Sequence, residues 1–152
     1  MKSPITRLGT LSDLETLNNI SYQSKKHWGY PDEWMERWKD DLTIDENKFD
    51  ELKILVLELD NKVIGFGSMS ENEETYEILD LWLLPSQIDH GFGKLLLGQV
   101  ISTFAVAQKP ITLTADPNAE AFYASQGFVT IDQIESFPKG RFLPVMLRKT
   151  SD

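Results

Sequence analysis

The chain has 152 residues, 41% of them hydrophobic and 26% charged, which is typical of a single soluble globular domain. It has no cysteine, which excludes disulfides, thiolate metal sites and a cysteine nucleophile, and its two histidines are too few for a multi-histidine metal cage. We therefore expect no bound metal. The net charge of −9 disfavours nucleic acid as a partner, because phosphate binding depends on Lys and Arg.

No apolar run approaches the ~20 residues that span a bilayer, so we expect no membrane partner. The first residues, Met1 to Pro4, lack the basic and then apolar layout of a signal peptide. We expect a cytoplasmic protein with one domain over residues 1–152. The sequence leaves the oligomeric state open, a homodimer included.

The first elements predicted along the chain are a short strand at Ile5–Leu8 and two helices. Ser12 and Glu15 form an S-x-x-E capping box, which predicts the start of the first helix. Pro31 suits the first turn of the second helix, in which apolar residues recur at helical spacing as far as Leu42. A further helical turn is expected at residues 46–52.

The hydrophobic period then changes to that of strands. Residues 53–59 and 62–69 read as a hairpin with the turn-forming pair Asp60 and Asn61 at its tip. A third, largely apolar strand is expected at residues 76–84.

The remaining elements alternate between helix and strand. A long apolar helix is predicted at residues 91–108, a strand at 111–114, a helix at 118–126 and closing strands at 128–134 and 143–147. A strand–helix–strand crossover demands parallel neighbours, whereas the hairpin demands antiparallel ones. The fold class is therefore α/β with a mixed sheet.

Two glycines, Gly91 and Gly93, open the long helix directly after the third strand. The free N–H groups of a helix start, at the positive end of its dipole, can seat phosphate oxygens, and glycine lets a ligand approach the backbone. The segment is neither a P-loop nor a dinucleotide fingerprint, because Leu95 and Leu96 stand where those motifs need other residues. Alone, this motif is a weak signal.

A second motif follows at residues 116–128, with Asn118, Ala121, the Phe122–Tyr123 pair and a closing Gly127–Phe128. Together the two segments resemble the GNAT superfamily of acyl-CoA-dependent N-acetyltransferases. The resemblance implies a GNAT fold, with a mixed twisted sheet of about six to seven strands flanked by helices on both faces. It also implies acetyl-CoA as co-substrate and an amine as acceptor, and the acidity of the chain favours a small-molecule amine as this partner.

The resemblance assigns the binding of acetyl-CoA to three segments. The loop and helix start would hold the pyrophosphate, and these residues are Asp89, His90, Gly91, Phe92, Gly93 and Lys94. The backbone of Trp82, Leu83 and Leu84 would pair with the pantetheine arm, as would Asn118, whose alternative role is a helix N-cap. The family's Gln or Arg position falls on Ile88.

The reaction requires a base for the acceptor ammonium and a donor for the departing thiolate. The resemblance makes Tyr123 that donor; the alternative is an aromatic pair packed under the sheet. Glu77 is the first candidate for the base and Asp80 the second, and both could instead be ordinary strand residues. Side chains alternate along a strand, so at most one of them points into the cleft unless a bulge intervenes.

Acceptor specificity is expected from the loop between the first two helices, where His27, Trp28 and Tyr30 lie beside a strongly acidic region. Residues 32–80 hold 16 acidic and 5 basic side chains, a net charge of −11 that favours a cationic acceptor. Helical spacing instead places Trp34 and Trp38 in the core.

The sequence thus predicts an N-acetyltransferase that moves an acetyl group from acetyl-CoA to a primary amine by direct attack in a ternary complex. A small, cationic amine is the first choice of acceptor and a protein amine the second. The alternative is a non-catalytic acyl-CoA sensor or regulatory module on the same fold, which Ile88 and Asp89 in the loop motivate.

Overall fold

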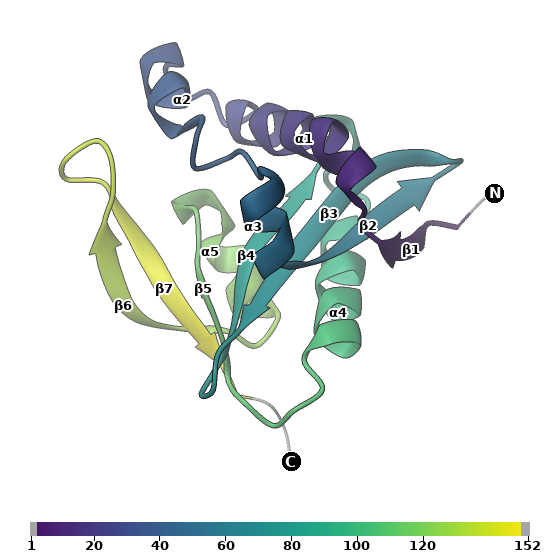
Figure 1. The fold of residues 1–152 in the computed structure, drawn as a ribbon. Helices are drawn as coiled ribbons and strands as arrows, with labels where there is room; N and C mark the ends of the chain where they lie inside the picture. The colour runs from purple at the N-terminus through teal and green to yellow at the C-terminus, as the bar shows by residue number, and fades with distance from the viewer. Residues whose placement is uncertain (1–2, 150–152) are drawn as a thin grey trace.

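The computed structural model of the chain describes residues 3–149, which form one twisted, mixed sheet with helices on both faces (Figure 1). Across the described residues the strand order is β1-β2-β3-β4-β5-β7-β6. The strands are β1 (Ile5–Leu8), β2 (Lys53–Leu59), β3 (Lys62–Glu71), β4 (Tyr76–Leu83), β5 (Ile111–Thr114), β6 (Val129–Glu135) and β7 (Phe142–Arg148). Only β4 and β5 pair in parallel, so the expected α/β class with a mixed sheet is confirmed.

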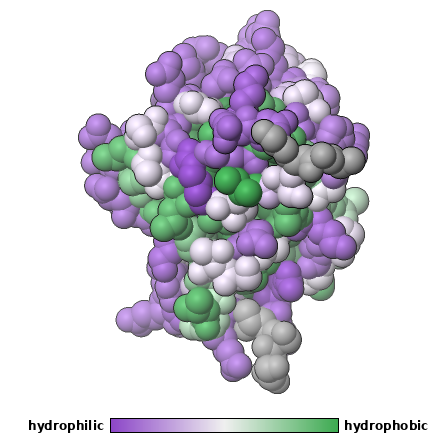
Figure 2. Space-filling model, turned by 90° about the vertical axis from the view of Figure 1, so that its right-hand side faces the viewer, coloured by the Kyte–Doolittle hydropathy of each residue, from purple (hydrophilic) through white to green (hydrophobic). Residues whose placement is uncertain are grey.

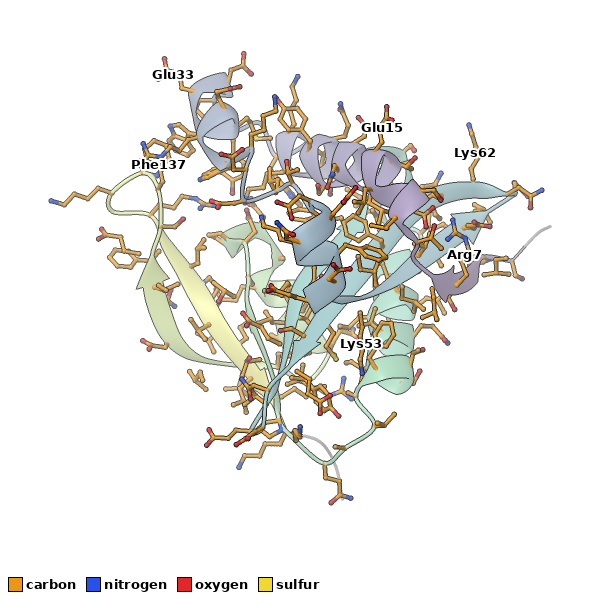
Figure 3. All side chains as sticks on the ribbon, in the orientation of Figure 1. Arg7, Glu15, Glu33, Lys53, Lys62 and Phe137 are labelled. Carbon is orange, nitrogen blue, oxygen red and sulfur yellow. The ribbon has the colours of Figure 1, made fainter. Side chains whose placement is uncertain are left out.

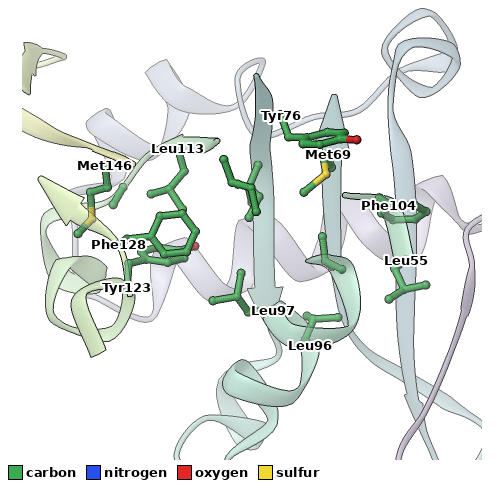
Figure 4. Packing of buried hydrophobic residues seen from close by; sticks show 14 of the residues in the cluster. Leu55, Met69, Tyr76, Leu96, Leu97, Phe104, Leu113, Tyr123, Phe128 and Met146 are labelled. Atoms are coloured by element: carbon green, nitrogen blue, oxygen red, sulfur yellow. The ribbon is translucent and has the colours of Figure 1, made fainter. Parts of the chain in front are cut away.

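The helices divide between the two faces of the sheet. They are α1 (Leu14–Lys26), α2 (Asp32–Trp38), α3 (Glu46–Glu51), α4 (Phe92–Phe104) and α5 (Glu120–Ser125), with short 3-10 turns η1 (Leu11–Asp13), η2 (Pro85–Gln87) and η3 (Pro117–Ala119). One core joins the sheet to α4 and α5, and Figure 4 shows its packing around Tyr76, Leu97, Tyr123 and Phe128. A second core on the opposite face joins the sheet to α1 and to residues of and beside α3.

The hairpin of β2 and β3 turns where the sequence predicts. Asp60 and Asn61 have φ values of 54° and 66°, the left-handed conformation of a two-residue hairpin turn. Asn and Asp tolerate this region better than most residues, which explains why this pair marks the turn.

The start of α1 differs from the expectation of a box at Ser12 and Glu15. The carboxylate of Asp13 accepts the backbone N–H of Thr10 at 2.7 Å, so the box spans Thr10–Asp13 and a 3-10 turn precedes the helix. Arg7 of β1 donates two further hydrogen bonds to Asp13, each 2.9 Å long. This ion pair holds the Asp13 carboxylate in its place in the capping box and lowers the pKa of Asp13 to about 2.

Two predicted helices are shorter in the structure. The second helix ends at Trp38, and Leu42 follows in a turn whose amide donates to the Trp38 carbonyl at 3.0 Å. The long helix ends at Phe104 rather than at Gln108. The amide of Ala107 donates to the buried Tyr76 hydroxyl at 2.9 Å, which holds this part of the chain in a non-helical path toward β5.

Figure 2 views the side of the molecule on which β1 lies in Figure 1, and apolar areas there are interrupted by polar side chains. Among residues 3–149, no helix has the length and apolar character needed to cross a membrane.

Candidate active site

The sheet opens between its two parallel strands. The register of β4 and β5 ends at the pair Ile78 and Leu113, and Figure 1 shows the two halves of the sheet diverging from there. Leu79 follows at once as a bulge, because Asp80 and Ile78 pair with consecutive residues of β3. A bulge bends its strand, so this one turns β4 away from β5.

The bulge also answers the question of which carboxylates share a face. Glu77 pairs with Ser70 and Asp80 pairs with Ser68, and these two residues of regular β3 lie on the same face. Glu77 and Asp80 therefore both face the α1 side of the sheet, which an unbulged strand would not allow.

A large groove of about 490 Å³ lies where β4, the start of α4, α5 and the end of α1 meet. The residues that line this large groove are Ser24, Trp28, Leu81, Trp82, Leu83, Ile88, Asp89, Gly91, Gly93, Lys94, Asp116, Asn118, Ala119, Phe122, Tyr123 and Gln126. It unites most of the residues that the sequence assigns to acetyl-CoA, although they come from segments far apart in the chain.

The start of α4 has the geometry of a phosphate seat. Asp89 and Gly91 have φ values of 71° and 79°, and Gly91 is the N-cap, with no side chain capping the helix. The first amides of the helix, from Phe92 to Lys94, have no intrahelical acceptor, as at any helix start. Gly91 has open space around it, whereas a Cβ at Gly93 would lie 3.4 Å from the Phe122 ring. The groove thus offers backbone donors, a helix dipole and one lysine to a phosphate-bearing ligand.

Three residues of the predicted binding set lie outside the large groove. Leu84 uses its amide to donate to the Ile64 carbonyl at 2.8 Å, and its carbonyl accepts from Gln87. His90 and Phe92 contact each other edge to face, with ring centroids 5.7 Å apart. The Leu84 backbone is therefore occupied within the protein, whereas Trp82 and Leu83 line the large groove.

The sequence reasoning counted Ile88 only as a departure from the family pattern. It missed other residues that line the groove, namely Ser24, Leu81, Asp116, Ala119, Phe122 and Gln126. Phe122 and Gln126 had a signal, since both lie in the second motif. Ser24 had none, because its place depends on how the end of α1 packs.

Tyr123 of α5 lies at the inner end of the large groove. It is 8% exposed, and its ring packs edge to face on Phe128 (Figure 4). Its hydroxyl makes no hydrogen bond to any residue between 3 and 149. Burial, and to a lesser degree the nearby Asp80, raises the pKa of Tyr123, so the phenol is protonated at neutral pH.

Asp80 lies at the opposite face of the sheet, in the α3-side cavity of about 260 Å³. The residues that line the α3-side cavity are Asp41, Thr43, Ile44, Lys48, Glu51, Leu52, Leu79 and Asp80. The Asp80 carboxylate accepts hydrogen bonds from the Ser68 hydroxyl at 2.5 Å and from the Trp82 indole at 3.1 Å. Burial nevertheless raises the pKa of Asp80, which moves this carboxyl toward the range of a general base.

The β4–β5 gap, a space of about 80 Å³, lies between the large groove and the α3-side cavity. Tyr123 lines both the gap and the large groove, and Asp80 lines both the gap and the α3-side cavity. Glu77 is half-buried, pairs with Ser70 and Thr112, and lies outside all three spaces.

A partly buried polar network centres on Asp116, which lines the gap. Asp116, at the end of β5, accepts from Lys25 at 2.5 Å and from the Tyr30 hydroxyl at 3.0 Å, and Arg141 donates to the same carboxylate at 3.2 Å. Burial alone would raise the pKa of Asp116, but the Lys25 charge and the hydrogen bonds hold it below its usual range. Burial lowers the pKa of Lys25, against the attraction of Asp116.

Asp116 is also the N-cap of η3, since it accepts the backbone N–H of Asn118 at 2.9 Å. The Asn118 side chain donates to the Tyr30 hydroxyl at 3.0 Å and to Asp116 at 2.9 Å. The capping role that Asn118 could have had thus belongs to Asp116, and Asn118 still lines the groove.

The same network ties the β6–β7 loop to the first helices. Figure 3 shows this loop, marked by Phe137, beside α2. The Arg37 guanidinium lies 4.6 Å from the Phe137 ring centre, and that of Arg141 lies 4.7 Å from the Trp38 ring centre. Trp38 is buried, as its helical spacing predicts, and Trp34 packs beside it with ring centres 5.8 Å apart.

The predicted acceptor residues divide between different places. Tyr30 is held in the network, with its ring facing Lys25 and Arg141. Trp28 lines the large groove, and His27 is exposed and packs against Trp28. In the described part of the chain, no three His, Asp or Glu residues group closely enough to hold a metal ion.

The mixed sheet that opens between its two parallel strands is the fold that the sequence predicts. Residues 14–128 match the Acetyltransferase (GNAT) family. Because this match spans more than half of the chain, the protein belongs to that family.

Solved structures agree on the fold. A PaiA N-acetyltransferase from Thermoplasma acidophilum in complex with coenzyme A shares 22% identity and a TM-score of 0.77, covering 97% of this chain and 99% of that one. A GCN5-related N-acetyltransferase from Rhodopseudomonas palustris shares 21% identity and a TM-score of 0.79, covering 99% and 98%. A putative acetyltransferase, yncA, from Salmonella typhimurium with its cofactor acetyl-CoA shares 17% identity and a TM-score of 0.70, covering 99% and 95%.

No curated protein matches this chain. Membership of the family supports an acetyltransferase that depends on acetyl-CoA.

Proposed function

We propose that the protein transfers an acetyl group from acetyl-CoA to a primary amine by direct attack in a ternary complex. One observation carries this proposal. The β4–β5 gap shares Tyr123 with the lining of the large groove and Asp80 with the lining of the α3-side cavity, so it lies between the two spaces. Two substrates entering from opposite faces of the sheet would meet there without a covalent enzyme intermediate.

In this proposal the donor lies in the large groove, with its pyrophosphate on the first amides of α4 and beside Lys94. Leu83 turns its backbone toward the open edge of β4 and pairs with the pantetheine arm there, beside the lining residue Trp82. The amide oxygen of Asn118 serves the same arm, because its amide nitrogen is already engaged by Tyr30 and Asp116.

The proton transfers follow from the positions of Asp80 and Tyr123. Asp80 takes a proton from the acceptor ammonium, since only the neutral amine is a nucleophile. The amine nitrogen then forms a bond to the thioester carbonyl carbon, the carbon–sulfur bond breaks, and the nitrogen releases its second proton to solvent to give the neutral amide. The Tyr123 hydroxyl gives its proton to the departing thiolate, and solvent restores both side chains. Glu77 lies outside the gap, which makes it the weaker candidate for the base.

The acceptor we propose is a small, cationic amine that enters through the α3-side cavity. Asp41, Glu51 and Asp80 line this cavity. Its only lining cation among the described residues is Lys48, whose ammonium donates to the carbonyls of Asp40 and Thr43 at 3.1 and 2.9 Å. Opposite charges at the mouth raise the local concentration of a cation. A protein amine is the second choice.

A sensor or regulatory module that binds acyl-CoA without catalysis is the second candidate function. Ile88 and Asp89 both line the large groove, one without a polar group and the other with a negative charge near the phosphate seat. Like-charge repulsion weakens phosphate binding and would suit a protein that releases its ligand readily.

The test is to incubate the purified protein with acetyl-CoA and a panel of amines, namely spermidine, glucosamine, a peptide with a free N-terminus and a lysine peptide. Thiol release and the mass of the product are then measured. Acetylation of one class supports the enzyme and identifies its acceptor. Binding of acetyl-CoA without thiol release for any amine favours the sensor.

A further inference from the structure

Trp28 is an exposed aromatic side chain in an unusual place. It is 45% exposed, although a large indole is normally well covered. It lines the large groove together with Ser24, whereas the α3-side cavity is lined by residues of other segments. The sequence predicts that Trp28 contacts the acceptor. The structure instead places Trp28 in the large groove, which we propose to hold the donor.

The loop that carries Trp28 is anchored on both sides of this residue. Three residues earlier, Lys25 forms an ion pair with Asp116, and two residues later the Tyr30 hydroxyl donates to the same carboxylate. The Trp28 amide donates to the Lys25 carbonyl at 3.3 Å, and Gly29 turns the chain with a φ of 81°. His27 packs against the indole with ring centres 5.5 Å apart.

These contacts fix the backbone of the loop and so keep Trp28 at the wall of the groove. A residue whose backbone is already fixed loses less conformational entropy on binding, and the exposed apolar surface of its ring is available to a ligand. The anchoring residue Asp116 also lines the groove and caps η3, which leads into α5. The loop with Trp28 is therefore held against the segment that follows β5.

We infer that Trp28 binds the coenzyme A part of the donor, by packing its indole against the ligand in the large groove, and that it does not select the acceptor amine. This inference rests on the proposed function, because it takes the large groove to be the donor site. It adds an aromatic contact from the loop after α1 to a site otherwise built from β4, α4 and α5.

The test is calorimetric titration with coenzyme A of the wild type, of Trp28→Ala and of Phe142→Ala. Phe142 is the matched control, because it is an aromatic side chain 51% exposed on β7 and lies outside the groove. We expect Trp28→Ala to weaken coenzyme A binding by on the order of tenfold, as loss of a well-packed ring should. We expect Phe142→Ala to bind within about twofold of the wild type.

Trp28→Gln, which keeps a long side chain but removes the ring, should show the same loss and covers the case in which the alanine variant folds poorly. An affinity of both Trp28 variants within about twofold of the wild type would overturn the inference while leaving the proposed function intact. A wild-type protein that binds no coenzyme A at all would instead overturn the proposed function. In steady-state assays with spermidine or another active amine, the KM for acetyl-CoA should rise and that for the amine should not; the reverse pattern would return Trp28 to the acceptor.

Discussion

The substitution Tyr123→Phe should lower turnover while leaving the stability of the fold unchanged. The Tyr123 hydroxyl has no hydrogen-bond partner among residues 3–149, so its removal breaks no bond that stabilises the native state. We expect the free energy of unfolding to change by no more than about 0.5 kcal/mol. Coenzyme A affinity should stay within about twofold, because the ring that lines the groove is kept.

Turnover should nevertheless fall. General acid catalysis contributes about 10²- to 10⁴-fold, and a thiolate is a good leaving group, so we expect kcat to fall by about 10²-fold. The assay combines a steady-state rate of thiol release, a urea melt and calorimetric titration with coenzyme A.

Tyr76→Phe is the matched control. Tyr76 is 1% exposed in the same core, but its hydroxyl accepts the Ala107 amide at 2.9 Å. Its removal leaves the partly buried Ala107 amide without this partner and should cost about 1 kcal/mol of stability with little change in kcat. If Tyr123→Phe kept wild-type turnover, Tyr123 would have no part in the mechanism, and the reasoning from its unpaired hydroxyl would be refuted.

Three further predictions follow from the same geometry. The kcat/KM of the wild type should fall as pH drops through the raised pKa of Asp80, and Asp80→Asn should lose activity by about 10²-fold together with that limb of the pH profile; an unchanged profile would remove Asp80 as the base. Gly91→Glu should abolish coenzyme A binding in calorimetry, whereas Gly140→Glu, which places the same side chain at an equally open residue with positive φ, should not; equal binding by both would show that the start of α4 is not the phosphate seat. Asp116→Asn leaves two buried cations without their counter-ion and should cost about 3 kcal/mol in a urea melt. Because the pKa of Asp116 is lowered in the folded protein, its contribution to stability is complete above the unfolded value near 3.8 and is lost as pH falls through the folded value; stability of Asp116→Asn equal to that of the wild type at neutral pH would contradict this.

Much of the fold follows from local sequence signals. The Asp60–Asn61 turn, the hydrophobic period of β2 to β4 and the glycine that opens α4 each depend on a few neighbouring residues, and each is confirmed. Helix ends were less predictable. The end of α4 is set by Tyr76, which accepts the amide of Ala107, a contact that no helix-propensity argument contains.

The site could be predicted only where residues lie close together in the chain. The two motifs predicted most of the large groove, because each motif folds as a unit. The bulge at Leu79, which puts Glu77 and Asp80 on one face, depends on the register with β3 and has no clear mark in the sequence. The network around Asp116 joins residues that are up to 91 positions apart in its ion pairs, so neither Lys25 nor Arg141 could be assigned to it beforehand.

The measurement that tests the account most directly is a crystal structure of Tyr123→Phe with coenzyme A. We expect the pyrophosphate on the first amides of α4, the pantetheine arm along Trp82 and Leu83, and the sulfur at the β4–β5 gap beside residue 123. The α3-side cavity should remain open behind Asp80. Coenzyme A bound away from α4, or a sulfur directed out of the gap toward solvent, would contradict the assignment of the two faces of the sheet to donor and acceptor.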